Sequence, residues 1–413
     1  MIQPRSGPIR IVTFSTLFPN AVQGTHGIFV ENRLRHLVAS NRVTARVVAP
    51  VPWFPFRAEA FGRYGQLARV PSRDVRFGID IVHPRYPVLP KIGMGVAPLS
   101  LYAFVKPVLA RLISNGWDFD LLDAHYFFPD GVAAVMLGRA LGKPVTITAR
   151  GTDINLIPRY PLPRRMIRWA AERADGVITV CAALKDELVH LGVAPERVRV
   201  LRNGVDLTVF RPLNPQQAKQ ALGLSGPVLA SVGALIARKG HELVIRALET
   251  VPNVTLLIAG EGAEKAALAR LAAATGVASR VRFLGSVPHQ RLREIYSAAD
   301  ALVLASSREG WPNVLLESMA CGTPAIASNV WGAPEIIKAP EAGVLLQNRT
   351  ARGIASAAKA LLAALPSREA TRAYAERFSW RDTTEGQVDL FSQILRSPSP
   401  VLSVPSHSQP GLP

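Results

Sequence analysis

The chain alternates short apolar runs with helix-like segments along almost its whole length, and the alternation occurs twice. Runs that predict strands of a first sheet lie at 9–14, 44–49, 79–82, 121–125, 144–149, 176–180 and 198–201. Runs that predict a second sheet lie at 228–233, 254–259, 281–284, 301–305, 323–328 and 344–346. Apolar strands separated by helices form parallel sheets covered on both faces. The pattern therefore predicts an α/β protein of two doubly wound, Rossmann-like domains facing a cleft.

A turn and a Pro-rich segment separate the two alternations. Asn203-Gly204-Val205-Asp206 predicts the turn, and residues 212–217 predict a linker that enters a helix. With 413 residues, each half is long enough to bury a core. We expect a first domain over 1–205, a second over 206–380, and a disordered Ser- and Pro-rich tail over 397–413.

The net charge of +18 is concentrated in the first half of the chain. Residues 1–205 contain 27 Lys and Arg against 14 Asp and Glu, which leaves +5 for the remainder. A large anionic partner should therefore meet the first half. No helix-turn-helix, zinc-finger or ribonucleoprotein motif supports nucleic acid as that partner. The alternatives are an anionic membrane surface and an ordinary solvated basic surface.

Two segments of the first half combine apolar and basic residues. Residues 97–115 are mostly apolar, and Lys106, Pro107 and Arg111 interrupt them, so we do not expect a membrane-spanning helix. Arginines alternate with bulky apolar side chains at positions 159, 164, 165 and 168. The first segment can be a core helix and the second an ordinary amphipathic helix. Both can also lie on an anionic lipid surface.

Three features that often signal chemistry have simpler explanations here. Cys181 and Cys321 lie in apolar surroundings and suit buried core positions in a reducing compartment. Asp118-Phe119-Asp120 resembles a metal-binding motif but directly precedes a strand, so we interpret it as a turn and expect no metal. His125 ends that strand, where ligands of parallel sheets collect, and it can equally be a structural histidine.

The segment Ser306–Pro324 contains the strongest site signal. It leaves a buried strand, exposes Glu309, and enters a helix for which Pro312 suits the first turn. Such a helix start favours a phosphate or another anion. Glu317 follows on the helix, so the two carboxylates could hold two parts of an elongated, hydroxyl-rich ligand.

A second signal lies at the end of the strand over 228–233. Arg238-Lys239-Gly240 follows Gly233, and Gly260-Glu261-Gly262 ends the next strand. Cations at one strand end beside the helix start at Pro312 form a diphosphate site.

These residues resemble the GT-B glycosyltransferases of family 4, which are retaining enzymes. Glu309-x7-Glu317 is similar to the family's E-x7-E element, and Asn203–Asp206 with Phe210 and Pro212 resembles its inter-domain signature. Gly233…Gly240 resembles the family's donor-phosphate loop, and Ile258-x-Gly260-x-Gly262 resembles the family's strand that follows this loop. The segments Gly27–Val30 and Ala149–Asn155 are most similar to a bacterial cell-surface polysaccharide subgroup that includes teichuronic-acid-type transferases. The match at Phe378–Arg381 implies that a helix over 381–396 crosses back to the first domain.

The resemblance implies a nucleotide-diphosphate sugar held mainly by the second domain. Glu317 would bind the ribose, Glu309 the sugar hydroxyls, and Arg238 and Lys239 would neutralise the leaving diphosphate. Donor contacts are implied for Gly27, Gly233, Gly260, Gly262, Gly310, Trp311, Pro312, Asn313, Val314 and Glu317. The acceptor or sugar side is assigned to His125, Arg150 and Asp153. Arg150 stands where many members carry His, and Ala234 where many carry Arg.

The predicted function is a metal-independent, hexosyl-type glycosyltransferase without a cofactor, acting on a UDP-sugar in preference to a GDP-sugar. Its acceptor would be a cell-surface polysaccharide or a polyprenyl-linked saccharide. Because residues 1–12 lack the apolar core of a secretory signal, we expect a cytoplasmic protein attached to the inner face of the membrane by its first half. The alternatives are a nucleotide-sugar epimerase on the same fold and a non-catalytic basic module that binds membrane or nucleic acid.

Overall fold

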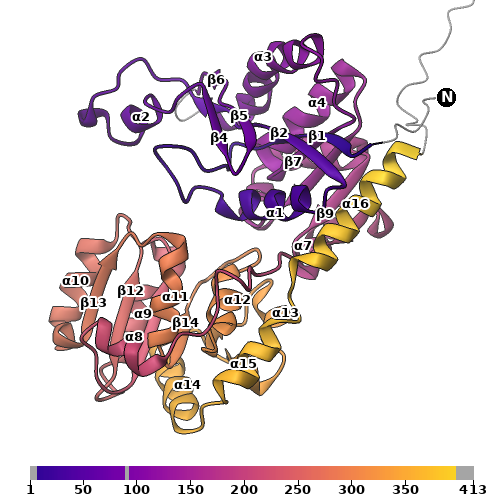
Figure 1. The fold of residues 1–413 in the computed structure, drawn as a ribbon. Coiled ribbons are helices and arrows are strands. Elements are labelled where there is room, and N and C mark those ends of the chain that lie inside the picture. The colour runs from indigo at the N-terminus through magenta and orange to yellow at the C-terminus, as the bar shows by residue number, and fades with distance from the viewer. Residues whose placement is uncertain (1–6, 89–92, 397–413) are drawn as a thin grey trace, which may run out of the picture. The chain divides into compact units, whose positions relative to one another are not determined.

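The structure is a computed structural model that describes residues 7–88 and 93–396. The chain divides into two compact units (Figure 1). Unit 1 comprises Met1–Thr179, Leu188–Arg199 and Thr384–Pro413, and unit 2 comprises Val180–Glu187 and Val200–Thr383. The tail predicted at 397–413 lies outside the described residues.

Unit 1 is built on an eight-stranded sheet. In spatial order its strands are β10 (Val198–Val200), β9 (Gly176–Thr179), β8 (Val145–Ala149), β7 (Leu121–His125), β1 (Ile9–Phe14), β2 (Val43–Val48), β5 (Ile79–Val82) and β4 (Arg73–Arg76). The pairs from β9 to β5 are parallel, and β4 is antiparallel to β5. The strand order reverses between β1 and β7, which is where open α/β sheets bind ligands.

Helices cover both faces of this sheet (Figure 1). The side chains of α1 (Ile28–Ala39) and α16 (Trp380–Arg396) form one core with β1 and β2. The opposite layer contains α3 (Gly93–Ser114), α4 (Val132–Leu141) and α6 (Pro161–Arg173). The short helix α5 (Thr152–Asn155) follows β8, and α7 (Ala182–His190), most of which belongs to unit 2, follows β9.

Helix α3 is apolar and long enough to cross a membrane by length and composition alone, which is weak evidence by itself. One face of α3 packs into unit 1, with Leu101, Val105 and Leu109 fully buried. The rest of the helix surface is largely exposed, because only 22% of its most apolar window is buried. The expected core helix is therefore correct for one face only.

Residues 51–88 contain more structure than the single strand at 79–82 that the sequence predicted there. Besides β5 and β4, they form α2 (Gly62–Leu67) and a two-stranded parallel sheet of β3 (Val51–Pro52) and β6 (Arg85–Tyr86). Two-residue strands carry no detectable periodicity, and the charged sequence of β4 is typical of an edge strand. Figure 1 shows α2 on an excursion that extends outward beyond β4 and β6.

Unit 2 contains a six-stranded, fully parallel sheet. In spatial order its strands are β13 (Val281–Gly285), β12 (Thr255–Ala259), β11 (Val228–Val232), β14 (Ala301–Leu304), β15 (Ala325–Ser328) and β16 (Gly343–Leu346). Numbered within the unit, this order is 3-2-1-4-5-6, the Rossmann arrangement, with its switch point between β11 and β14. The predicted strands of both sheets agree with the observed ones to within about two residues at each end.

One face of the unit 2 sheet packs against α9 (His241–Ala247), α10 (Lys265–Ala274) and α14 (Ala351–Ala363). The helices on the other side are α8 (Pro215–Ala221), α11 (Leu292–Ala298), α12 (Asn313–Ala320), α13 (Ala333–Ile336) and α15 (Arg368–Ala375). Helix α15 was not predicted from the sequence. Pro312 occupies the N-cap position of α12, one residue before the first turn in which we had expected it.

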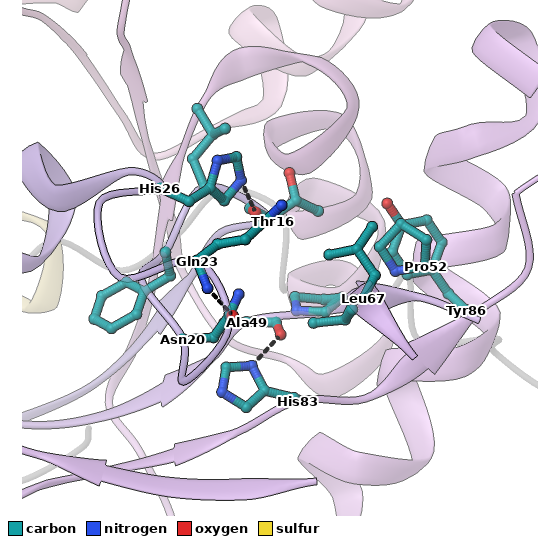
Figure 2. A pocket seen from close by; sticks show the side chains of 13 residues that line it. Thr16, Asn20, Gln23, His26, Ala49, Pro52, Leu67, His83 and Tyr86 are labelled. Atoms are coloured by element: carbon teal, nitrogen blue, oxygen red, sulfur yellow. Dashed lines mark hydrogen bonds between the residues drawn. The ribbon is translucent and has the colours of Figure 1, made fainter. Parts of the chain in front are cut away.

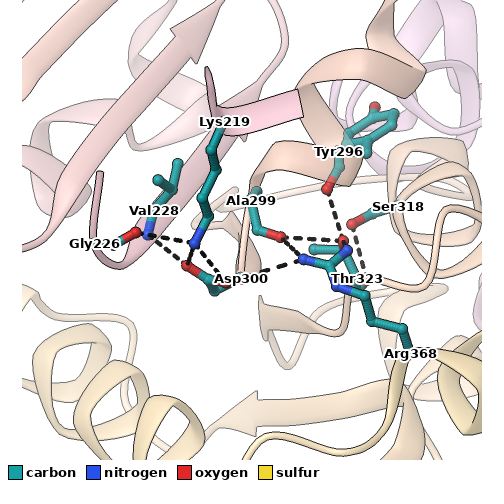
Figure 3. Close-up of polar contacts among 9 residues, drawn as sticks. All are labelled: Lys219, Gly226, Val228, Tyr296, Ala299, Asp300, Ser318, Thr323 and Arg368. Carbon is teal, nitrogen blue, oxygen red and sulfur yellow. Dashed lines mark hydrogen bonds and ion pairs between the residues drawn. The ribbon is translucent and has the colours of Figure 1, made fainter. Parts of the chain in front are cut away.

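A polar cluster ties several elements of unit 2 together at the amino end of β14 (Figure 3). The Asp300 carboxylate accepts hydrogen bonds from Lys219 Nζ at 2.8 Å and from the Val228 N–H at 2.7 Å. Arg368 donates to the carbonyl oxygen of Ala299 at 2.6 Å and lies 4.0 Å from Asp300. Since ligands of parallel sheets bind at the carboxyl ends of strands, this cluster holds the fold and is not the site.

Candidate functional site

Glu309 lies in the loop between β14 and α12, beside the topological switch point of unit 2. Its carboxylate accepts a hydrogen bond from Lys239 Nζ at 2.6 Å, and its other oxygen is 3.6 Å from the Arg238 guanidinium. Glu309 is 8% exposed. Burial raises the pKa of Glu309, but the charges and hydrogen bonds of its neighbours, Lys239 foremost, outweigh burial and lower it overall. The carboxylate is therefore ionised at neutral pH.

The two cations reach Glu309 because two loops clasp each other. Arg238 donates to the Arg308 carbonyl at 2.6 Å, and the Ser307 N–H donates to the Arg238 carbonyl at 2.8 Å. Both cations lie on a short 3₁₀ turn, Ala237–Lys239, that follows β11. The structure thus brings this turn and the Glu309 loop together, and their role as one binding site stays a prediction.

Glycines allow the backbones at this edge to approach closely. A Cβ at Gly260 would lie 1.9 Å from the Gly233 carbonyl oxygen, and one at Gly262 would lie 2.3 Å from that of Leu235. At Gly233, a Cβ would lie 3.3 Å from Lys239 Cε. All three glycines therefore serve loop packing, and the donor contacts implied for them stay predictions.

The start of α12 presents backbone N–H groups beside this cluster. Within the described residues, no side chain caps it at Pro312, and the helix runs from Asn313 to Ala320. The Trp311 indole is buried and donates to the Asn203 carbonyl at 3.0 Å, so this side chain fixes the loop. Positive partial charge at a helix start favours an anion.

Glu317 is held separately from Glu309, by two residues that the sequence analysis did not identify. His289 Nε2 lies 2.8 Å from one carboxylate oxygen, and the Tyr296 hydroxyl donates to the other at 3.1 Å. The ring of Phe210 packs 5.0 Å from that of His289. Neither partner stood out in the sequence, because an isolated His and Tyr in helical segments resemble ordinary core residues.

His241 was also missed, although it directly follows the Arg238-Lys239-Gly240 motif. Its Nε2 lies 3.3 Å from the Ala234 carbonyl and its Nδ1 lies 2.9 Å from Ser231 Oγ. Burial, helped by the Lys239 charge and opposed by the hydrogen bond to the Ala234 carbonyl, lowers the pKa of His241 to about 4. The neutral ring must donate from Nε2 to the carbonyl, so Nδ1 accepts from the serine hydroxyl. His241 thereby anchors the backbone after Gly233.

In unit 1, His125 and Arg150 are in direct contact at the ends of β7 and β8. Arg150 lies 2.6 Å from His125 Nδ1, and His125 Nε2 lies 3.2 Å from the Asp123 carboxylate. Arginine can only donate, so Nδ1 accepts and Nε2 carries the proton donated to Asp123. Burial lowers the pKa of His125 to about 4, which keeps the ring neutral.

Asp123 is the centre of a larger buried network. Burial raises its pKa, but hydrogen bonds and charges from its neighbours, His125 foremost, lower it overall. Gln387 of α16 donates to Asp123 at 3.0 Å and accepts from Arg33 Nε at 2.8 Å. The network therefore joins α1, β7, β8 and α16.

Asp153 has a local structural role. Its carboxylate accepts hydrogen bonds from the N–H groups of Phe127 at 2.7 Å and Gly151 at 2.7 Å, and more weakly from that of Arg150. Burial raises its pKa, and these hydrogen bonds oppose the rise. Asp153 thus fixes the loop that presents Arg150.

Gly27 belongs to unit 1, whereas the other implied donor-binding residues belong to unit 2. Its φ is +70°, and a Cβ there would lie 2.3 Å from the Leu17 backbone. It precedes α1 and lets the loop after β1 close on itself.

Metal and thiol chemistry receive no support from the described residues. Within 7–88 and 93–396, no group of three His, Cys, Asp or Glu residues is placed to hold a metal ion. Asp118 pairs with Lys143 at 2.6 Å, and Asp120 accepts the Arg10 N–H, as expected for a strand-entry turn. Cys181 and Cys321 are free and buried, and burial raises the pKa of each thiol to about 12.

Comparison with known protein families gives two matches that follow the two halves of the chain. Residues 85–209 match the model described as glycosyltransferase family 4. Residues 214–378 match the model described as glycosyl transferases group 1.

Several curated and solved proteins are similar to this chain. A D-inositol 3-phosphate glycosyltransferase of Acidothermus cellulolyticus is 33% identical over 327 residues, which cover 72% of each chain. One from Mycobacterium marinum is 31% identical over 311 residues, covering 70% of this chain and 66% of its own. Sucrose-phosphate synthase from Thermosynechococcus elongatus aligns with a TM-score of 0.77 at 20% identity, covering 94% of this chain and 99% of its own. Anabaena HepE in complex with UDP aligns with a TM-score of 0.70 at 18% identity, covering 93% and 100%.

Proposed function

Because this chain belongs to the group 1 glycosyltransferases of family 4 and has their two-domain GT-B fold, we propose that it transfers a sugar from a nucleotide diphosphate to a saccharide acceptor with retention of anomeric configuration. The acceptor is a cell-surface polysaccharide or a lipid-linked saccharide. The observation that carries the proposal is the cluster of Glu309, Lys239 and Arg238 beside the start of α12.

The donor diphosphate binds at this cluster. Lys239 and Arg238 keep 14% and 29% of their side chains exposed, so a phosphate can reach them without unfolding either loop. Phosphate oxygens can share the two cations with Glu309, and the N–H groups at the start of α12 supply further donors. Negative charge grows on the diphosphate as the glycosidic bond breaks, and cations already in place stabilise that charge.

Glu317 binds the ribose of the nucleotide. Each carboxylate oxygen has two acceptor positions, and one position on each is used by His289 or Tyr296. A ribose hydroxyl can donate to a remaining position. The base is uracil in preference to guanine, and transfer requires no metal ion because Lys239 and Arg238 provide the positive charge.

The chemical step exchanges one bond of the anomeric carbon for another on the same face of the sugar. The bond to the diphosphate oxygen breaks as the bond to the acceptor oxygen forms, and the acceptor proton passes to the leaving phosphate. Glu309 holds the sugar hydroxyls and is not assigned as a nucleophile. In unit 1, Arg150 binds the acceptor or the sugar, and the buried, neutral His125 positions the Arg150 guanidinium.

Unit 1 also attaches the enzyme to the inner face of the cell membrane. Apolar side chains on α3 and at the start of α6 are exposed, among them Met94, Leu99 and Leu162. The two segments adjoin, because a Cβ at Gly95 would lie 2.9 Å from the Leu162 side chain. Exposed arginines at 164, 165 and 168 follow on α6. Apolar side chains beside basic ones suit an anionic lipid surface.

Membrane attachment is tested by sedimentation with vesicles. We expect binding to phosphatidylglycerol vesicles that weakens with salt, and little binding to phosphatidylcholine vesicles. Arg164→Glu combined with Arg165→Glu should abolish it. Equal binding to both vesicle types would contradict the proposal.

The donor is tested by thermal unfolding of the full chain with UDP- and GDP-sugars, because a ligand of the native state raises the unfolding temperature. We expect a UDP-sugar to stabilise the protein and Glu309→Gln to lose sugar transfer. Lys265→Ala, which removes an exposed ion pair with Glu261 in the same unit, is the matched control. If transfer persists in Glu309→Gln, the assigned site is wrong. Nucleotide release without any acceptor would favour an epimerase.

A further inference from the structure

The excursion between β2 and α3 carries an exposed cluster of aromatic rings that the proposed mechanism does not use. The name aromatic platform is used here for Phe54, Phe56, Phe61 and Tyr64, whose rings contact one another, together with the exposed Trp53, which directly precedes Phe54 in the sequence. The ring of Phe54 lies 5.4–5.9 Å from those of Phe56, Phe61 and Tyr64, and Phe56 and Phe61 stack at 5.0 Å. Trp53 and Phe56 are more than half exposed, at 56% and 55%. A contiguous exposed aromatic surface of this kind marks a binding site more often than chance.

The platform adjoins a hollow of about 150 Å³ in unit 1 (Figure 2). Pro52, directly before Trp53, and Leu67, one helical turn after Tyr64 on α2, line one side of it together with Tyr86. Figure 2 shows Asn20, Gln23 and His26 on the other side. At about 30 Å³ for each liquid water, the hollow has room for about five waters. A hollow of this size can admit one sugar ring.

One buried side chain of the hollow has an unused donor. Asn20 is 3% exposed, and its amide oxygen accepts the N–H groups of Val22 at 3.0 Å and Gln23 at 2.9 Å. This orients the amide, since the oxygen must face those two donors. Among the residues that the structure describes, none accepts a hydrogen bond from the Asn20 amide nitrogen. The Asn20 amide nitrogen is accessible from the hollow and can donate to a ligand oxygen. Gln23 Oε1 and His83 Nε2, which also line the hollow, are buried and have no hydrogen-bond partner among the described residues, so they can accept from ligand hydroxyl groups.

The charge of the hollow indicates the class of ligand. The residues that line it include no Lys, Arg, Asp or Glu. The two histidines are His26 and His83; burial lowers the pKa of His83, and its Nδ1 lies 2.9 Å from the Ala49 carbonyl. A phosphate would find no cation on these walls, whereas hydroxyl groups would find neutral donors and acceptors.

We infer that the hollow and the aromatic platform together bind an uncharged sugar of the acceptor. One ring enters the hollow, where Asn20 donates to a ring or hydroxyl oxygen, and the C–H face of the same or the next sugar packs on the platform through Trp53 and Tyr64. A sugar has this combination of apolar face and hydroxyl edge, whereas a lipid chain would leave the polar wall unpaired. The inference rests on the proposed function only in treating this sugar as the acceptor.

The test is saturation-transfer NMR on the full chain with methyl glycosides of glucose, galactose, mannose and N-acetylglucosamine, and with D-myo-inositol 3-phosphate as the charged probe. We expect transfer to the ring protons of at least one neutral glycoside and none to the phosphate. Trp53→Ala, Tyr64→Ala and Asn20→Asp should each reduce the signal at least fivefold. Phe77→Ala, an exposed aromatic of the same unit outside the platform, is the matched control and should leave it unchanged.

Three results would overturn the inference. They are no transfer to any glycoside, an undiminished signal in both Trp53→Ala and Tyr64→Ala, and a preference for the inositol phosphate. Loss of vesicle binding in Trp53→Ala with unchanged glycoside signals would instead assign the platform to lipid. Thermal shifts with UDP are recorded on the same variants. If the wild-type protein binds glycosides but no nucleotide sugar, the proposed function is contradicted and the inferred sugar site is still supported.

Discussion

In unit 2, Glu309 meets Lys239 and Arg238 at strand ends, and both cations keep part of their side chains exposed. In unit 1, Asp123 and His125 are 0% and 1% exposed, and their polar atoms bond to one another and to neighbouring side chains. Charges in the first arrangement can exchange a protein partner for a ligand phosphate at little cost. Charges in the second cannot, because removing one partner leaves another buried and unpaired. We therefore infer that the charged part of the ligand binds in unit 2, and that the buried network of unit 1 serves to position side chains.

The largest effect is expected from breaking the buried network of unit 1. Asp123→Ala leaves Arg33 and His125 without their carboxylate and should lower the free energy of unfolding by about 3–5 kcal/mol. Hydrogen exchange should accelerate most in β7 and β8 and least in β14. Asp80→Ala, which removes an exposed pair with Arg46, should cost about 1 kcal/mol or less. Unchanged hydrogen exchange in β7 of Asp123→Ala would contradict the proposed difference between the two units.

In unit 2 we expect a large loss of activity and a smaller loss of stability. Lys239→Ala removes charge from the leaving diphosphate and should reduce kcat about 10²–10³-fold, or ~2.7–4 kcal/mol of barrier. Its unfolding temperature should fall less than that of Asp123→Ala, because Arg238 still lies 3.6 Å from the Glu309 carboxylate and keeps part of its side chain exposed. Lys265→Ala should change the unfolding temperature least. A Lys239→Ala enzyme that unfolds early and turns over normally would reverse the assignment of the two clusters.

Acid should destabilise both units through buried histidines whose pKa is lowered, chiefly His125 in unit 1, where His83 adds to the effect, and His241 in unit 2. Burial lowers the pKa of His125 and of His241 to about 4, whereas an unfolded histidine titrates near 6.5. Between these values the unfolded chain binds protons that the folded chain does not, so stability falls as pH drops from about 6.5 to 4. The loss is at most roughly 3 kcal/mol per histidine.

Two variants separate these contributions. His241→Asn should reduce the pH dependence of hydrogen exchange in unit 2 only. His125→Asn should reduce the pH dependence of hydrogen exchange in unit 1 only. Parallel pH slopes in wild type and both variants, measured by urea unfolding between pH 4 and 7, would show that neither histidine is buried in its neutral form.

The smallest expected effect tests how the Glu317 carboxylate is held in place. Tyr296→Phe removes one hydrogen bond to its carboxylate and should cost about 1.5–3 kcal/mol of stability. UDP affinity, measured by calorimetry, should fall less than tenfold because His289 still holds Glu317. Tyr160→Phe, on an exposed ring, is the control. A loss of UDP binding far beyond tenfold would place Tyr296 itself against the nucleotide.

Strands and motif positions could be predicted, while the partners of the motif residues could not. Runs such as 228–233 and 301–305 are apolar throughout, which buried parallel strands require, and the structure places strands there. The Glu309 segment and the Arg238-Lys239 turn were expected to lie together, because the ends of parallel strands share one edge of a sheet, and the structure brings them into contact. His241, His289, Tyr296 and Gln387 were missed, since each is a single polar residue whose importance depends on a contact that only the folded chain forms.

Local pattern also failed where elements are short or exposed. The sequence indicated a single strand between residues 51 and 88, and β3, β4, β6 and α2 were not anticipated. These elements are held together by the packing of Val51, Leu67 and Val70 on one another, and this small cluster shows no periodicity in the sequence. Asp153 was assigned to a ligand from its position in a motif, but its carboxylate is occupied by backbone N–H groups.

The sequence by itself determined the two doubly wound domains, the strand ends at which the site forms, and the charge types gathered there. These follow from local hydrophobicity and from the shared edge of parallel strands. Only the tertiary structure decided which charges are locked and which are accessible. Burial and hydrogen-bond partners arise from contacts between residues far apart in the chain: Lys239 with Glu309, Gln387 with Asp123, and Asn20 with the hollow beside the aromatic platform.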